Sequence, residues 1–177
     1  MKRLVNSFTE WGRLREVVVG RALGSCIPRN EPAFVAKVPR NLKLYHVEGP
    51  RSNEACDRAT EELDGLVDVL VQHGVRVRRP EPFNFNSPVA TPDFNVPCGN
   101  TSAMPRDVLL TVGNEIIEAP MSWRARFFEY RAYRKMLNGM FEQDVNWLWT
   151  AAPKATMADS LYRTDYPIDP TKDASPE

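Results

Sequence analysis

Histidine and cysteine are scarce in this sequence. Its 177 residues include two histidines, His46 and His73, and three cysteines, Cys26, Cys56 and Cys98. No two cysteines are spaced as Cys-x-x-Cys, and the number of cysteines is odd, so a zinc site and a disulfide framework are both unexpected. We expect neither a bound metal nor a cofactor in this chain.

The sequence also lacks a surplus of charge and any long apolar run. Lysine plus arginine and aspartate plus glutamate both number 23, so the formal net charge is zero. A general nucleic-acid binder needs excess positive charge, so we expect no nucleic acid as a partner. The apolar runs are as short as Val17–Val19, which excludes a membrane span. A hydrophobic content of 42% still predicts a folded core, and the length fits one ordinary domain.

A targeting leader is missing from the visible start of the chain. Residues 1–7 contain no apolar signal core and no long leader rich in arginine and serine. We therefore expect a cytoplasmic location.

Proline, in contrast, is abundant, with 15 residues against 9 glycines. The prolines concentrate in two stretches that show no hydrophobic period, 21–52 and 80–106. Proline fixes its own backbone and cannot donate to a helix or sheet. These stretches are predicted to be long, ordered loops.

A strand, a helix and a second strand are predicted in the first half. The run 16–20 is β-branched and ends in glycine, which is typical of a buried strand. From 53 to 73 a helix is predicted, because the apolar residues at 59, 63, 66, 67 and 70 share one helical face, with Ser52 as the expected N-cap and Gly74 as the helix stop. The alternation of valine and arginine over 75–78 then indicates a strand.

The second half repeats this mixture of strands and one helix. Strands are predicted at 107–112 and 115–118 around a Gly113-Asn114 turn, followed by a helix from 122 to about 142 and a strand at 147–149. The basic side chains of that helix are interpreted as a solvated face. The similar content of the two halves suggests two related α/β modules.

Two aspartates in the second proline-rich stretch are candidates for binding a planar cation. Asp93 follows Thr91-Pro92, and Asp107 follows Pro105-Arg106 at the end of the loop. Paired carboxylates match the N–H fork of a guanidinium group. The alternative is structural: Asp93 forms an Asx-turn, and Asp107 pairs with Arg106 or another neighbour.

Cys98 lies in the same loop, but neither histidine does. A catalytic thiolate needs a nearby base or a cationic field, so a packed thiol is the favoured interpretation of Cys98, Cys26 and Cys56. His73 is expected at a helix C-terminus, in a capping or packing role.

Several ordered blocks resemble the arginine:glycine amidinotransferases and their relatives in antibiotic and toxin pathways. They begin with Val5–Ala22 and continue through Gly74–Pro80 and Thr91–Phe94. The densest blocks are Ser102–Asp107 and Val112–Met121, and the likeness runs on through Trp123–Arg134 and Ala152–Asp159. The segment 24–50 matches poorly.

This resemblance implies a five-bladed α/β propeller of pentein type, of which this chain would hold about two ββαβ modules with long proline-rich loops. It also implies covalent chemistry. A cysteine thiolate attacks the guanidinium carbon of arginine, ornithine leaves, and an acceptor amine such as glycine takes the amidino group. Asp93 matches the family's substrate-binding aspartate, and Asp107 lies in a block beside the site. These two are the candidate substrate-binding residues.

The chain departs from the family in length. Family members are about twice as long, and their catalytic cysteine, histidine and its aspartate partner lie in the second half. Neither Cys98 nor His73 stands at those positions, so no catalytic residue is assigned here and the chain alone is predicted to be inactive. Its partners would be arginine and an amine acceptor in a complete enzyme.

Three hypotheses remain open. The chain is the front part of an amidinotransferase, or a non-catalytic truncated homologue that binds guanidinium groups or other proteins, or an unrelated α/β binding domain. We expect a propeller-like part over 1–163 and an acidic, proline-containing tail over 164–177. Because an isolated propeller sector exposes apolar faces, we also expect homo-oligomers or association with a missing half. The family-like region begins close to Met1, which adds to the cytoplasmic expectation.

Overall fold

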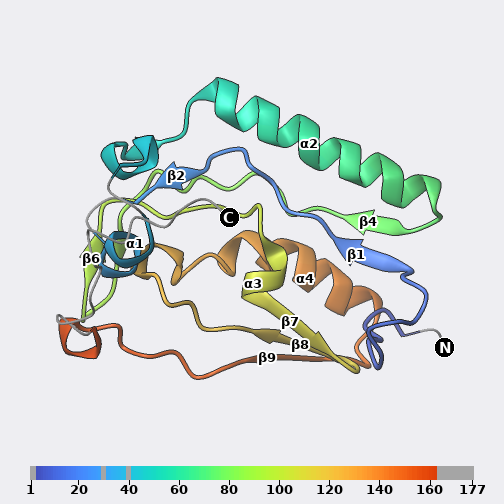
Figure 1. Ribbon diagram of the computed structural model, residues 1–177. Helices are drawn as coiled ribbons and strands as arrows, with labels where there is room; N and C mark the ends of the chain where they lie inside the picture. Colours follow the sequence, from blue (N-terminus) through green and yellow to red (C-terminus); the bar gives the residue numbers. More distant parts are fainter. Residues whose placement is uncertain (1–2, 29–30, 39–40, 163–177) are drawn as a thin grey trace.

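The computed structural model describes residues 3–28, 31–38 and 41–162 (Figure 1). The acidic tail predicted over 164–177 lies outside the described residues. The helices are α1 (Pro32–Lys37), α2 (Asn53–Gln72), α3 (Pro105–Val108) and α4 (Arg131–Gln143), with short 3-10 turns η1 (Lys43–His46), η2 (Arg124–Arg126) and η3 (Asp159–Leu161). The strands are β1 (Glu16–Val18), β2 (Cys26–Ile27), β3 (Gly49–Pro50), β4 (Arg76–Arg78), β5 (Val89–Ala90), β6 (Asn95–Val96), β7 (Leu109–Val112), β8 (Glu115–Glu118) and β9 (Leu148–Ala151).

The predicted strand–helix–strand unit of the first half is confirmed. Strand β1 pairs in parallel with β4, with Val17 opposite Val77, and α2 connects them. Ser52 caps α2, because its hydroxyl accepts a hydrogen bond from the Ala55 N–H at 3.2 Å. Gly74 follows the helix with a φ of 74°, a left-handed conformation that glycine adopts without strain.

Helix α2 covers this two-stranded sheet incompletely. Cys56 is its buried residue, and α2 packs against β4. Leu66, Val69 and Val71 remain about half exposed. Of these three, Leu66 belongs to the predicted apolar face, which is therefore only partly buried within the described chain, and α2 lies on its outside (Figure 1).

The second half forms a three-stranded sheet backed by α4. The β7–β8 hairpin turns at Gly113, whose φ is 59°, and β9 adds in parallel beside β8 after α4. The element order β7–β8–α4–β9 is thus ββαβ, as expected for the second module. The main core includes Val108 of α3, Ile116 of β8, Tyr133 and Leu137 of α4, and Trp147 just before β9.

The long stretches predicted as loops contain short elements. Within 21–52 the strands β2 and β3 pair antiparallel, and α1 and η1 lie between them. Within 80–106 the strands β5 and β6 form a small hairpin, and α3 begins at Pro105. Elements of two to six residues are too short to show a hydrophobic period, which is why the sequence does not predict them.

The start of the second predicted helix is wrong. Residues 124–126 form the 3-10 turn η2, and regular α-helix begins only at Arg131. The side chains of Arg124, Arg126 and Glu129 are buried, not solvated as predicted. The predicted α-helical face does not apply to this segment, because residues before Arg131 do not follow the α-helical period.

The fold class is α/β, as expected, and the sheets of the described chain are small, with two or three strands each. No helix in the described ranges is long and apolar enough to cross a membrane.

Candidate functional site

Asp93 occupies the turn of the β5–β6 hairpin. The Thr91 N–H donates to the Phe94 carbonyl at 2.9 Å, and the Thr91 hydroxyl accepts from the N–H groups of Asp93 and Phe94 at 3.2 and 3.3 Å. Thr91, not Asp93, therefore closes the turn, and the Asx-turn alternative does not describe it. The Asp93 side chain is exposed, and within the described ranges no hydrogen bond or ion pair occupies its carboxylate. Its acceptor capacity is free.

Asp107 is held by a partner distant in sequence. It lies in α3, and its Oδ2 accepts from Arg126 Nη1 at 3.0 Å. Its side chain is 37% exposed. The structural alternative predicted from the sequence was a pair between Asp107 and Arg106 or another neighbour. In the structure the partner is Arg126, which lies on η2. One carboxylate oxygen, Oδ1, has no partner within the described part of the chain.

Arg126 connects Asp107 to a buried carboxylate. Arg126 Nε donates to Glu129 Oε2 at 2.8 Å, and the Thr101 N–H donates to Glu129 Oε1 at 3.1 Å. The Glu129 side chain is 1% exposed and that of Arg126 is 10% exposed. Arg126 Nη2 is buried and has no hydrogen-bond partner among the described residues. This cluster is not among the sites predicted from the sequence, although opposite charges three residues apart are a signal for an ion pair.

Burial also changes the acidity of this cluster. Desolvation raises the pKa of Glu129 from 4.5 to about 7, against the lowering effects of Arg126 and the Thr101 N–H. Between these two values the folded protein binds the proton more tightly than the unfolded chain does. The contribution of Glu129 to stability is therefore complete below its unfolded pKa and is lost as the pH rises towards 7.

We expect this linkage to be measurable with the variant Glu129→Gln. The stability of the wild-type chain relative to that of the variant should fall by about 3 kcal/mol between pH 4.5 and pH 7, because the shift in pKa has that free-energy equivalent. Urea unfolding at several pH values measures the difference. A difference that stays constant over this range would show that the pKa of Glu129 is the same in the folded and unfolded states.

The turn η2 connects the regions of both candidate aspartates. The Phe94 ring, next to Asp93, packs edge-on against Phe127 with 5.5 Å between centroids, and the Arg124 guanidinium lies 5.5 Å from the Phe94 ring. On the same turn, Arg126 binds Asp107. Neither aspartate lines the large cavity beside β1 or the smaller one beside Cys56. The regions of both carboxylates therefore contact η2. The two carboxylates are not bonded to each other, and neither lines one of these cavities.

The three cysteines are packed thiols, as predicted. Cys26, Cys56 and Cys98 are at most 6% exposed. Burial raises the pKa of Cys26 to about 12 and raises that of Cys98 as well. Neither thiol supplies a thiolate near neutral pH. His73 ends α2, and its Nδ1 lies 2.8 Å from the Val69 carbonyl oxygen, which fits the predicted capping role.

Acidic and sulfur side chains do not converge on a metal position in the described ranges. No group of three or more histidine, cysteine, aspartate or glutamate residues there could hold an ion.

Comparison with known proteins gives a consistent result. The chain is 45% identical over 176 residues to mitochondrial glycine amidinotransferase of Danio rerio, covering 96% of this chain and 40% of that protein. It is 39% identical over 161 residues to L-arginine:L-lysine amidinotransferase of Pseudomonas savastanoi pv. phaseolicola, covering 89% and 44%. No family model matches the sequence.

The fold gives the same relationship. The structure of SxtG, an amidinotransferase from Microseira wollei in saxitoxin biosynthesis, superposes with a TM-score of 0.79 at 41% identity, over 90% of this chain and 44% of that one. The chain therefore spans about two fifths of the length of the relatives that it matches. The resemblance identified from the sequence blocks is confirmed.

The predicted cytoplasmic location is contradicted. The relative from Danio rerio and those from Gallus gallus and two Xenopus species are all described as mitochondrial. The prediction relied on the residues at the start of the chain, and those residues do not carry that conclusion.

Proposed function

We propose that the chain is part of an amidinotransferase, an enzyme that transfers the amidino group of L-arginine to an acceptor amine, because it resembles amidinotransferases in both sequence and fold. The observation that carries this proposal is the match over 96% of the chain at 45% identity. It includes the blocks that hold both candidate aspartates. The non-catalytic alternative has no observation in its favour.

In this proposal the chain supplies about two modules of a five-bladed propeller. The ββαβ order of β7–β8–α4–β9 and the parallel β1–β4 pair joined through α2 support this architecture. Further modules would come from polypeptide outside the present sequence. That polypeptide would also supply the cysteine and histidine of the reaction, since the thiols of Cys26 and Cys98 are buried and protonated near neutral pH.

Asp93 and Asp107 would hold the arginine guanidinium. The unoccupied carboxylate of Asp93 can accept two N–H groups, and Oδ1 of Asp107 can accept one while Oδ2 stays bound to Arg126. With the guanidinium fixed, a thiolate would attack its carbon, and the C–N bond to ornithine would break as the leaving nitrogen is protonated. The acceptor amine, glycine-like by analogy with the relatives, would then displace the thiolate and take the amidino group.

A chimaera tests this function directly. Residues 1–162 would replace the matched part of the L-arginine:L-lysine amidinotransferase from Pseudomonas, and ornithine release from arginine would be measured. We expect release from the chimaera and none from the 177-residue chain alone. Asp93→Asn should lower kcat/KM about ten- to a hundredfold, the usual loss for a hydrogen bond to a charged group.

The matched control is Asp68→Asn, which makes the same chemical change at an exposed site on α2. It should leave ornithine release unchanged. A chimaera that is folded and monodisperse but releases no ornithine would contradict the proposed function. Equal activity of the Asp93 variant and the control would remove Asp93 from the site.

A further inference from the structure

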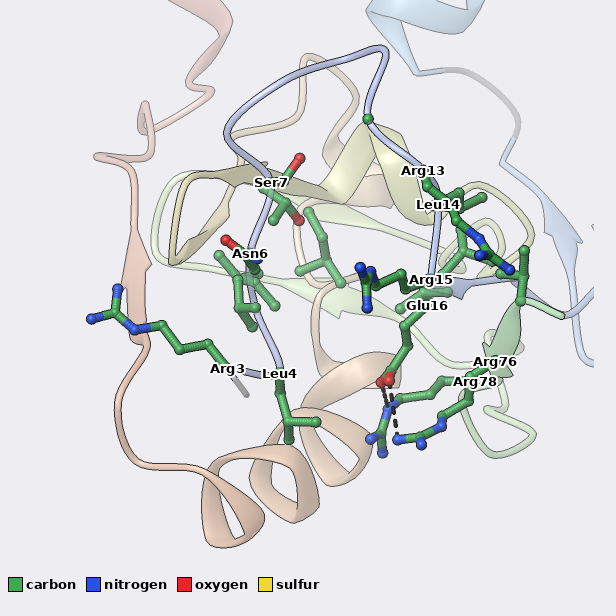
Figure 2. Close-up of a pocket in the computed structure, with 18 of the residues that line it drawn as sticks. Arg3, Leu4, Asn6, Ser7, Arg13, Leu14, Arg15, Glu16, Arg76 and Arg78 are labelled. Carbon is green, nitrogen blue, oxygen red and sulfur yellow. Dashed lines mark hydrogen bonds and ion pairs between the residues drawn. The ribbon is translucent and has the colours of Figure 1, made fainter. Parts of the chain in front are cut away.

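A cavity of about 1490 Å³ opens beside β1, between the N-terminal segment 3–18 and the ends of α2, α3 and β7. We call it the arginine cavity, because the charged side chains that line it are mostly arginines. They are Arg3, Arg13, Arg15, Arg76, Arg78 and Arg106, against Glu10 and Glu16. Several of them are drawn in Figure 2.

Most of this positive charge is not neutralised within the described chain. Glu16 binds both Arg78 and Arg76, the latter at 3.2 Å, as the dashed lines in Figure 2 show. Arg13, Arg15 and Arg106 form no ion pair with any residue in the described ranges, and all three are exposed. The cavity therefore attracts a group of opposite charge.

The rim of the arginine cavity is apolar and also uncovered. Phe8 is 68% exposed and Leu14 is 47% exposed, and both line it. Trp11, on the same segment, is 87% exposed. Exposed aromatic side chains interleaved with arginines are the composition of protein–protein contacts, not of a site for a small ion.

The arginine cavity lies at the end of the β1–β4 sheet that carries Glu16 and Arg76. The register places Glu16 opposite Arg76, and alternation puts both on one face and Val17 and Val77 on the other. Helix α2 packs against this sheet at β4. On the charged face, Val18 packs against the main core and Arg78 donates to Gln143 of α4, so it is the end of the sheet at Arg76, 65% exposed, that opens into the arginine cavity.

The complementary surface is present in the same chain. Helix α2 carries six acidic residues against the single basic residue Arg58, and we call this surface the acidic helix face. Its members are Glu54, Asp57, Glu61, Glu62, Asp64 and Asp68, of which Asp64 binds Arg79. Leu66 and Val69, about half exposed, add apolar surface beside them. A chain with no net charge thus carries two surfaces of opposite charge.

We propose that the arginine cavity of one copy of this chain receives the acidic helix face of a second copy. The positively charged arginine cavity is complementary to the negatively charged acidic helix face, and both surfaces carry exposed apolar side chains. The two surfaces are made of different residues, so the contact is head to tail and does not use the same patch twice. Head-to-tail contacts that do not close into a ring add copies progressively.

Sedimentation velocity of the purified chain at low and high salt tests this proposal. At about 50 mM NaCl the weight-average mass should rise with protein concentration, and at about 500 mM it should approach that of a monomer, because salt screens exposed charges. The apparent association constant should fall at least tenfold between these conditions. A monomer at every salt and protein concentration would overturn the proposal.

Charge reversal identifies the two surfaces. Arg13→Glu/Arg15→Glu and Glu61→Lys/Glu62→Lys should each be monomeric alone at low salt. Mixed in equal amounts, they should associate, because each restores the partner that the other has lost. The control Lys43→Glu/Arg131→Glu changes the net charge as the first variant does, at exposed sites away from both surfaces, and should associate like the wild type. Circular dichroism confirms that all variants are folded.

Each remaining outcome is decisive. Association that persists in both charge-reversed variants, or that does not depend on salt, would overturn the proposal and assign self-association to apolar surface. Failure of the mixture to associate would do the same. The proposal does not rest on the amidinotransferase function, so loss of ornithine release in the chimaera leaves it unaffected.

Discussion

Replacing Arg126 by methionine is expected to lower the free energy of unfolding by about 3–5 kcal/mol. The guanidinium is the cationic partner of both Glu129 and Asp107, and Glu129 is 1% exposed. Removing one partner of a buried ion pair leaves the other charge without solvent or counter-charge, which costs about this much. Urea unfolding at pH 8, where Glu129 is mostly ionised in the wild type, measures the loss.

A second substitution separates the lost pair from a general packing defect. In Arg126→Met/Glu129→Gln the buried charge is gone and the amide oxygen still accepts from the Thr101 N–H, so most of the stability should return. Arg76→Met is the control, since that arginine binds Glu16 at 65% exposure and should contribute less than about 1 kcal/mol. A double variant as unstable as the single one would mean that the loss comes from packing.

Gly20→Ala is expected to cost about 3 kcal/mol or more, and no side-chain motion relieves it. A Cβ at this position would lie 2.5 Å from the Ala103 carbonyl carbon and closer still to the Ser102 carbonyl oxygen. That oxygen accepts hydrogen bonds from the Arg21 N–H at 3.0 Å and from the Tyr133 hydroxyl at 2.8 Å. The backbone at Gly20 or at residues 102–103 must therefore move to accommodate the added Cβ, which is the cost of severe overpacking.

The matched control is Gly139→Ala in α4, where nothing lies within 4 Å of the added Cβ. Alanine in a helix interior should raise stability by about 1 kcal/mol relative to glycine. Thermal unfolding of both variants compares the same chemical change at a tight and an open site. If Gly20→Ala unfolds at the wild-type temperature, the segment after β1 does not rest against residues 102–103 in solution.

Sequence patterns predicted the elements that are long and periodic. The span of α2, its cap at Ser52 and its stop at Gly74 all agree with the structure, as do the Gly113-Asn114 turn and the strands beside it. These features depend on neighbours a few residues away, so they can be read locally. The α/β order and the family resemblance followed from them and from the ordered blocks.

The candidate site was only partly accessible to such reasoning. Asp93 and Asp107 stood out because carboxylates in a proline-rich loop suggest binding, but the partner of Asp107 lies 19 residues away on η2. Burial of Arg126 and Glu129 depends on tertiary packing over a turn that lacks the helical period. The arginine cavity likewise collects side chains from segments far apart in the sequence, which no spacing reveals.

The three packed thiols give this chain built-in probes of local opening. Cys26 lies in β2, Cys56 in the first turns of α2 and Cys98 in the loop after β6, so each belongs to a different segment. An alkylating reagent reaches a buried sulfur only when its segment separates from the rest. Alkylation followed by mass spectrometry would therefore rank how often each segment opens, without any engineered label.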